Sequence, residues 1–156
     1  MQKIELTQGK YAIVDDGDFD DLNQFNWCFH NSGYAVRGVR VSGKVTLQWM
    51  HRIITNCPAD MDVDHINHDK LDNQKSNLRV CSTSENCHNQ QMHSVAKTSR
   101  FKGVYFDKQA NKWRAQIKLN NKNKYLGLFT NEIDAAIAYN NAAIELFGEF
   151  AYLNVI

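Results

Sequence analysis

The stretch from Asp62 to Asn89 most constrains the fold, because it packs aspartate, histidine and asparagine more densely than an ordinary core or loop requires. Hydrolysis of a phosphodiester uses these residue types. Oxygen ligands hold a hard divalent cation, and a neutral imidazole takes a proton from the attacking water. Asp64 and His65 are adjacent here and can supply a ligand and a base. The sequence therefore predicts a metal-dependent nuclease site.

The same stretch resembles the HNH homing-endonuclease family, whose pattern is an Asp-His pair, a central Asn, and a third His or Asn on a following helix. The resemblance implies that His65 is the general base and that Asn77 braces the loop and orients that base. It also implies that Asp64 and Asn86 hold the metal ion. The third position is Asn, as in the HNN variant, which favours Mg²⁺ or Mn²⁺ over zinc because an amide oxygen is a poor ligand for a softer metal.

Local signals predict the frame of this site. Ser82 followed by Glu85 has capping-box spacing, which predicts a helix that begins near Thr83. Leu78 to Cys81 is expected to form a short strand before this helix. Another apolar segment is expected to end at Val63. A strand, loop, strand and helix around one cation is the ββα-metal arrangement that the resemblance implies. One face of the helix is expected to carry Asn86, Asn89 or Gln90, and His93.

Other polar residues nearby have several interpretations. His51 lies in the apolar run WMHRII, which predicts a mostly buried imidazole; a position beside the active site is the alternative. Asn89 is also expected near the site. Asn67 and Asn73 are interpreted as turn residues, because asparagine tolerates left-handed backbone and bonds its own chain.

Positive charge is concentrated after the polar stretch. Nine of the eighteen Lys and Arg residues lie between Lys97 and Lys124, and only Asp107 interrupts them. The net charge of +1 therefore hides a basic module, balanced by acids in the first twenty-two residues. Such a concentration of positive charge is typical of a protein that binds a partner with a phosphate backbone. The alternative interpretation is a solvated face, or lysines that protect an edge strand against aggregation.

Periodicity predicts how that charge is presented. From Lys112 to Leu119, polar and apolar residues alternate, which predicts a strand with one basic and one apolar face. Neighbouring strands are expected at Gly103 to Phe106 and at Lys124 to Phe129, giving a small antiparallel sheet. Thr130 or Asn131 is expected to cap a helix that Gly148 ends. Its predicted apolar stripe consists of Ala135, Ala136, Tyr139, Ala142, Ala143 and Leu146.

The chain from Phe101 onward resembles the AP2/ERF DNA-binding domain. The matching signatures are Lys102-Gly103-Val104, Trp113 with Ala115, Leu126-Gly127 with Phe129, Ala135-Ala136 with Ala138-Tyr139, and Leu153-Asn154. The resemblance implies that one sheet face enters the major groove. The DNA contacts implied by matching position are Lys102, Tyr105, Gln116, Lys118, Asn123 and Tyr125. Arg114 shares their face and is counted with them. Tyr105 and Gln116 replace the usual Arg and Glu, so the family's target sequence does not transfer.

The predicted fold is α+β in two domains. Residues 1–93 form a β-rich HNH unit that includes a hairpin of Tyr34 to Val41 and Lys44 to Ile54; residues 94–100 are a linker, and residues 101–156 are the AP2/ERF-like domain. With 156 residues at 43% hydrophobic, the chain can build two compact units but not one large enzyme core. The four cysteines form no CxxC pair. We therefore expect reduced, mostly buried thiols and no structural zinc.

Taken together, these features predict a site-selective endonuclease of the homing type. The AP2/ERF-like domain would locate a target in double-stranded DNA, and the HNH unit would cut one strand with one divalent ion. A homodimer or a second binding event would be needed for a double-strand break. No apolar run is long enough for a signal peptide or membrane span, so we expect an intracellular protein of a bacterium or phage-infected host. The alternatives are a catalytically silent DNA-binding regulator and an RNA-directed or structural nucleic-acid binder.

Overall fold

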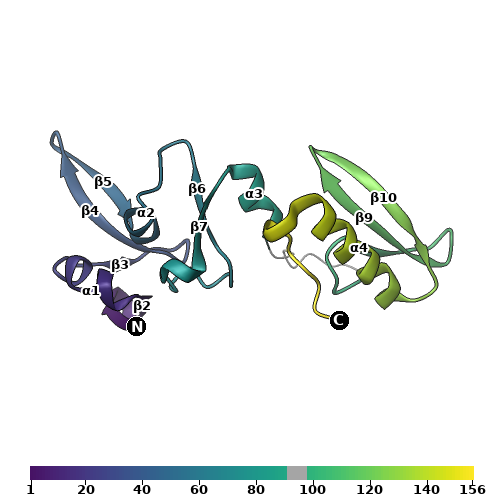
Figure 1. The fold of residues 1–156 in the computed structure, drawn as a ribbon, viewed down its shortest axis with the longest axis horizontal. Coiled ribbons are helices and arrows are strands. Elements are labelled where there is room, and N and C mark those ends of the chain that lie inside the picture. The colour runs from purple at the N-terminus through teal and green to yellow at the C-terminus, as the bar shows by residue number, and fades with distance from the viewer. Residues whose placement is uncertain (91–97) are drawn as a thin grey trace. The chain divides into compact units, whose positions relative to one another are not determined.

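The structure is a computed structural model in which residues 1–90 and 98–156 are described (Figure 1). The chain divides into two compact units, Met1–Asn86 and Cys87–Ile156. The predicted linker, residues 94–100, lies partly outside the described residues, and so does His93. No helix among the described residues is long and apolar enough to cross a membrane.

The first unit begins with small sheets around one core. β1 (Gln2–Glu5) pairs antiparallel with β2 (Tyr11–Val14), with a 3-10 turn, η1 (Thr7–Gly9), between them. α1 (Asp16–Asn23) follows. β3 (Cys28–Phe29), β4 (Ala35–Val41) and β5 (Lys44–Trp49) form an antiparallel sheet in that order. The predicted hairpin turn at Ser42-Gly43 is confirmed, since Val41 pairs with Lys44.

The second strand of that hairpin is shorter than predicted. The expectation that it runs to Ile54 was wrong, because residues 50–54 form a helix, α2 (Met50–Ile54). Met50 is completely buried and Ile54 packs against the same core. Helical i, i+4 spacing brings both side chains to one side, while a strand would also turn Arg52 toward the core.

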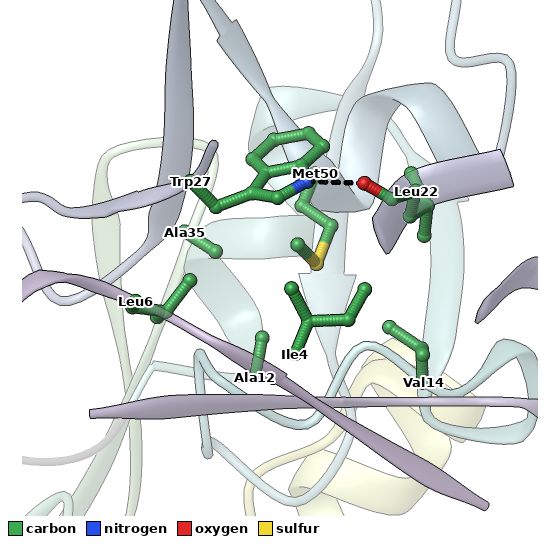
Figure 2. Close-up of a cluster of buried hydrophobic side chains, with 8 residues drawn as sticks. All are labelled: Ile4, Leu6, Ala12, Val14, Leu22, Trp27, Ala35 and Met50. Atoms are coloured by element: carbon green, nitrogen blue, oxygen red, sulfur yellow. Dashed lines mark hydrogen bonds between the residues drawn. The ribbon is translucent and has the colours of Figure 1, made fainter. Parts of the chain in front are cut away.

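Figure 2 shows the core of this unit, in which the Trp27 indole donates a 2.8 Å hydrogen bond to the Leu22 carbonyl. The buried side chains come from both sheets and from α1 and α2, so the core ties these elements together. They are Ile4, Leu6, Ala12, Val14, Leu22, Trp27, Ala35 and Met50.

The polar stretch forms a hairpin followed by a helix. β6 (Asp62–His65) pairs antiparallel with β7 (Leu78–Cys81), whose predicted bounds are confirmed, after a 3-10 turn, η2 (Lys75–Asn77). The loop between them is anchored on β2, because Ile13 donates to the Leu71 carbonyl and accepts from the Asn73 amide at 2.8 and 2.7 Å. α3 (Thr83–His88) follows β7.

α3 begins where the capping box predicts. Ser82 N–H donates to Glu85 Oε2 at 2.8 Å, and Glu85 N–H donates to Ser82 Oγ at 3.3 Å. The helix ends earlier than expected, at His88, so Asn89 and Gln90 follow it and do not share its face with Asn86. The box fixes only the start of a helix, and no equally strong signal marks its end.

The second unit packs one sheet on one helix. β8 (Val104–Asp107), β9 (Lys112–Leu119) and β10 (Lys122–Phe129) are antiparallel, with β9 in the centre. α4 (Glu132–Phe147) covers one face of the sheet (Figure 1), and a 3-10 turn, η3 (Gly148–Phe150), follows. Asn131 caps α4 by accepting from the Ile133 amide at 2.9 Å, and Gly148 ends it. The predicted sheet and helix are therefore present.

All four cysteines are free thiols. Only Cys81 is buried, whereas Cys28 and Cys87 are exposed and Cys57 is half-buried. The expectation of mostly buried thiols was wrong, because Cys81 on β7 is buried but Cys28 on β3 and Cys87 on α3 face solvent.

Candidate active site and nucleic-acid face

Asp64 and His65 lie side by side at the end of β6, and both are buried. Adjacent strand residues point to opposite faces, so the two side chains have different surroundings. Asp64 is paired across the hairpin with Arg79, and His65 with Leu78. This register places the Asp64 carboxylate beside the Arg79 guanidinium. The His65 imidazole faces a different set of neighbours.

The Asp64 carboxylate forms a buried ion pair. Arg79 donates from Nε and Nη2 to Asp64 Oδ2 at 2.8 and 2.6 Å, and both side chains are less than one-sixth exposed. Charge-assisted contacts of this kind hold a carboxylate in one orientation. Arg79 did not figure in the sequence interpretation. The signal was available, since aligning the two expected strands in antiparallel register places Arg79 opposite Asp64.

Asn77 braces the loop that follows His65. Its Oδ1 accepts from the Asn67 amide at 2.9 Å, and its Nδ2 donates to the Asp72 carbonyl at 2.8 Å. Its own carbonyl accepts from the Ile66 amide at 2.9 Å. One buried side chain thus closes the loop from both ends, directly beside His65. These contacts support the predicted bracing role, which stays a prediction.

Asn73 is a neighbour of the imidazole that sequence reasoning missed. It is fully buried and its Nδ2 donates to the Leu71 carbonyl at 3.1 Å. The Asn73 side chain close to the imidazole favours the protonated form and partly offsets the effect of burial on the pKa of His65. Asn73 bonds its own chain, as the interpretation as a turn residue expects, but its side chain is also buried close to His65. Asn67 does support a turn, since its Oδ1 accepts from the Asp69 amide at 2.9 Å.

Aromatic rings enclose the other side of the His65 imidazole. The structure places His51 against it, with ring centroids 5.3 Å apart and ring planes at 78°. Tyr34 lies 5.7 Å from His65 and 4.8 Å from His51. Trp49 extends the cluster, 5.7 Å from Tyr34. The two rings in contact with His65 come from α2 and from the segment before β4, and Trp49 of β5 packs behind them.

Both inner imidazoles are held neutral. Burial lowers the pKa of His65 below its usual value, and the nearby Asn73 side chain and the Asp64 charge offset this only in part. Burial, with a further contribution from His65, lowers the pKa of His51 to about 3. His51 Nδ1 is buried and has no hydrogen-bond partner among the described residues. A neutral imidazole is the form that can accept a proton from water.

The neutral state of His51 predicts acid sensitivity. In the unfolded chain this imidazole takes up a proton near pH 6.5, whereas in the folded chain it does so only near pH 3. Stability is therefore complete above pH 6.5 and falls as the pH drops toward 3, by about 1 kcal/mol for each pH unit from this one group. Melting temperatures measured between pH 7 and 4.5 should show a steep fall.

A matched pair of variants isolates this effect. His51→Phe keeps an aromatic ring but cannot titrate, so its melting temperature should fall less on acidification than that of the wild type. His30→Gln removes a half-buried imidazole outside the inner cluster and should retain the wild-type slope. Equal slopes for wild type and His51→Phe would show that His51 does not cause the sensitivity.

The donors present suit a hard cation. As the predicted ligands, Asp64 would supply a carboxylate from β6 and Asn86 an amide oxygen from α3, four residues after the Ser82 cap. Within residues 1–90 and 98–156 no group of three or more His, Cys, Asp or Glu residues could hold a metal ion. A site with two protein oxygens suits an ion such as Mg²⁺, which keeps several waters and takes further ligands from substrate phosphates. Asn89 lies after α3, in the second unit.

Most of the predicted DNA contacts share one face of the second unit's sheet. Tyr105 on β8 is directly opposite Arg114 on β9, and Gln116 and Lys118 on β9 are opposite Tyr125 and Asn123 on β10. Directly paired residues project to the same face. The face carries Tyr105, Arg114, Gln116, Lys118, Asn123 and Tyr125.

Lys102 differs from the other predicted contacts. Its ammonium donates to the His88 and Gln90 carbonyls at 3.0 and 2.7 Å, and burial lowers its pKa to about 8. Asn154 holds its backbone on both sides, accepting from the Lys102 amide at 2.6 Å and donating to its carbonyl at 3.1 Å. The lysine therefore links segments within its own unit.

Comparison with known proteins adds two findings. A family model described as HNH endonuclease matches residues 49–88, which include Asp64, His65, Asn77 and Asn86. A protein of Acanthamoeba polyphaga mimivirus, described as an uncharacterized HNH endonuclease, is 32% identical over 155 residues. That similarity covers 96% of this chain and 77% of the viral protein.

Proposed function

This chain belongs to the HNH endonuclease family, and from that premise we propose that it hydrolyses DNA phosphodiester bonds with one divalent ion, Mg²⁺ or Mn²⁺. The observation that carries the proposal is the buried, neutral His65 beside Asp64, at the start of a loop braced by Asn77. Metal-assisted hydrolysis requires a base and a metal ligand held in fixed positions, and the β6–β7 hairpin provides the frame for both.

In this mechanism His65 accepts a proton from the attacking water. Asn73, His51 and Tyr34 hold the ring orientation, and Asn77 keeps the following loop from shifting. Asp64 and Asn86 would hold the divalent ion, which when bound supplies Lewis-acid stabilisation of the charge on the phosphate and the leaving 3′ oxygen. Arg79 orients the Asp64 carboxylate and offsets its charge within the hairpin.

The proposal includes targeting by the second unit. Its sheet presents Tyr105, Arg114 and Lys118 on one face, and nine cations lie in the sequence from Lys97 to Lys124. A basic sheet face fits the major groove of double-stranded DNA, as the AP2/ERF resemblance implies. We therefore place the protein among site-selective endonucleases of the homing type, acting on DNA inside the cell. Lys102 is left out of this interface because its ammonium is bonded within the unit.

One active site for each chain cuts one strand. A single protomer should therefore produce a nick, and a double-strand break would need a homodimer or a second binding event. Sedimentation of the protein bound to a short duplex would distinguish these cases, because two protomers on one duplex are expected only if both strands are cut together.

Metal dependence tests the proposal. Supercoiled plasmid incubated with the protein and Mg²⁺ or Mn²⁺ should convert to nicked circles, and EDTA should stop the conversion because Asp64 and Asn86 alone cannot stabilise the leaving oxygen. Readdition of the metal should restore it. If the protein bound duplex DNA but left the plasmid intact with every metal, it would be a catalytically silent DNA-binding regulator.

A further inference from the structure

We propose that Lys102 is a positioning residue of the nuclease site, because its ammonium caps the C-terminal end of α3, the helix that carries Asn86. This inference rests on the proposed function, which assigns Asn86 to the divalent ion. Under it, the second unit stabilises the helix that carries a predicted metal ligand of the first unit.

α3 needs stabilisation from outside itself. It has six residues, Thr83–His88, and none of them is buried. Isolated helices shorter than about 12 residues are marginal in water, and most helical stability in proteins comes from packing. The capping box of Ser82 and Glu85 satisfies the first turn. The last carbonyls of any helix have no partner inside the helix, so the C-terminal end of α3 requires donors from elsewhere.

Those donors come from the second unit, which includes the last two residues of α3, Cys87 and His88. Lys102 Nζ donates to the His88 carbonyl at 3.0 Å and to the Gln90 carbonyl at 2.7 Å. A lysine at a helix C-terminus satisfies carbonyls and complements the negative end of the helix dipole. The His88 ring also stacks on Phe147 of α4, with centroids 3.8 Å apart and planes at 15°. Two contacts of different chemistry therefore hold the same end of α3.

Lys102 is itself held in place by the last residues of the chain. Its backbone amide and carbonyl both bond to the Asn154 side chain. Asn140 of α4 holds the Asn154 backbone through bonds of 2.9 and 2.8 Å. The ammonium lies 5.0 Å from the centre of the Tyr152 ring. A lysine restrained in this way loses less conformational entropy when it bonds to the end of α3.

The helical state of α3 determines where Asn86 lies. The Asn86 amide donates to the Ser82 carbonyl at 3.0 Å, so the first turn of α3 places Asn86 relative to the end of β7. If the C-terminal end frays, the six-residue helix retains few bonds to hold that turn. Only the helical fraction of the chain then presents Asn86 to a metal ion, and the apparent affinity falls in proportion to that fraction.

The experiment compares the wild type with Lys102→Met, which keeps the aliphatic stem and removes the ammonium, both as full chains. Without metal or DNA, the amides of α3 should exchange hydrogen about five- to tenfold faster in the variant, while the amides of β9 keep their protection. In plasmid nicking, the Mn²⁺ concentration for half-maximal rate should rise by a similar factor. Saturating Mn²⁺ should restore most of the maximal rate.

Lys108→Met is the matched control, because Lys108 is an exposed lysine of the same unit, in the turn between β8 and β9. It should leave the exchange of α3 and the Mn²⁺ requirement at the wild-type values. His88→Gln removes the ring that stacks on Phe147 and leaves Lys102 unchanged. It should shift both values in the same direction as Lys102→Met, by a smaller factor.

Unchanged exchange of α3 in Lys102→Met would overturn the inference, and so would faster exchange with an unchanged Mn²⁺ requirement. If Lys102→Met also exposed β9, His88→Gln would decide, and wild-type values for that variant would overturn the inference. A wild type that nicks no plasmid with any metal would overturn the proposed function and this inference together. Wild-type nicking with the same Mn²⁺ requirement in Lys102→Met would overturn this inference alone.

Discussion

Replacing His65 with glutamine is expected to slow nicking by about 10² to 10⁴-fold, the usual contribution of a positioned general base. Glutamine is similar in size to histidine and is polar, so the fold of the hairpin should persist. What is lost is a group that can accept the proton of the attacking water. Single-turnover conversion of supercoiled plasmid at saturating Mn²⁺ measures the rate without interference from product release.

His68→Asn provides the control for that experiment. His68 lies in the loop three residues later, with a φ of 66°, a backbone conformation that asparagine tolerates. It should nick at close to the wild-type rate. A rate for His65→Gln within a few-fold of the wild type, with both proteins melting at the same temperature, would remove His65 from the role of base.

Replacing Gly103 with alanine is expected to destabilise the second unit by about 3 kcal/mol or more, because overpacking and backbone strain combine. Gly103 has a φ of +77°, and a Cβ there would lie 2.1 Å from Cδ2 of Tyr139 and 2.5 Å from the backbone carbonyl oxygen of Gln116. Tyr139 is buried between α4 and the sheet and cannot move away freely. Chemical denaturation of the full chain would measure the loss.

Gly43→Ala separates strain from crowding. Gly43 has nearly the same φ, +79°, but a Cβ added at this residue in the β4–β5 turn would meet nothing within 4 Å. The substitution should cost only the left-handed backbone term, about 1 to 2 kcal/mol. Equal losses for Gly103→Ala and Gly43→Ala would show that the contact with Tyr139 is not the cause.

Local signals were sufficient wherever a short motif determines an element. The Ser82–Glu85 spacing located the start of α3, and the alternation from Lys112 to Leu119 gave the central strand. Asn131 and Gly148 bounded α4 because a cap and a left-handed glycine act within one helical turn. In each case, the decisive interactions are close in sequence.

Tertiary interactions determined what the sequence did not reveal. Residues 50–54 form α2 where a strand was predicted, because a helix lets Met50 and Ile54 pack on the same core. The Asn73 backbone bonds to β2, and its side chain lies close to His65. Arg79 meets Asp64 only because of the register between β6 and β7. Lys102, expected on the DNA face, instead bonds to carbonyls at residues 88 and 90. None of these contacts has a short-range signal of its own.

The most direct measurement of the central claim is nicking of supercoiled plasmid by the wild type and by His65→Gln, both with Mn²⁺, followed by treatment with DNA ligase. Nicked circles are expected from the wild type alone, and ligase should reseal them because water attack with departure of the 3′ oxygen leaves a 3′ hydroxyl and a 5′ phosphate. An intact plasmid despite DNA binding, equal nicking by His65→Gln, or nicks that ligase cannot close would contradict it.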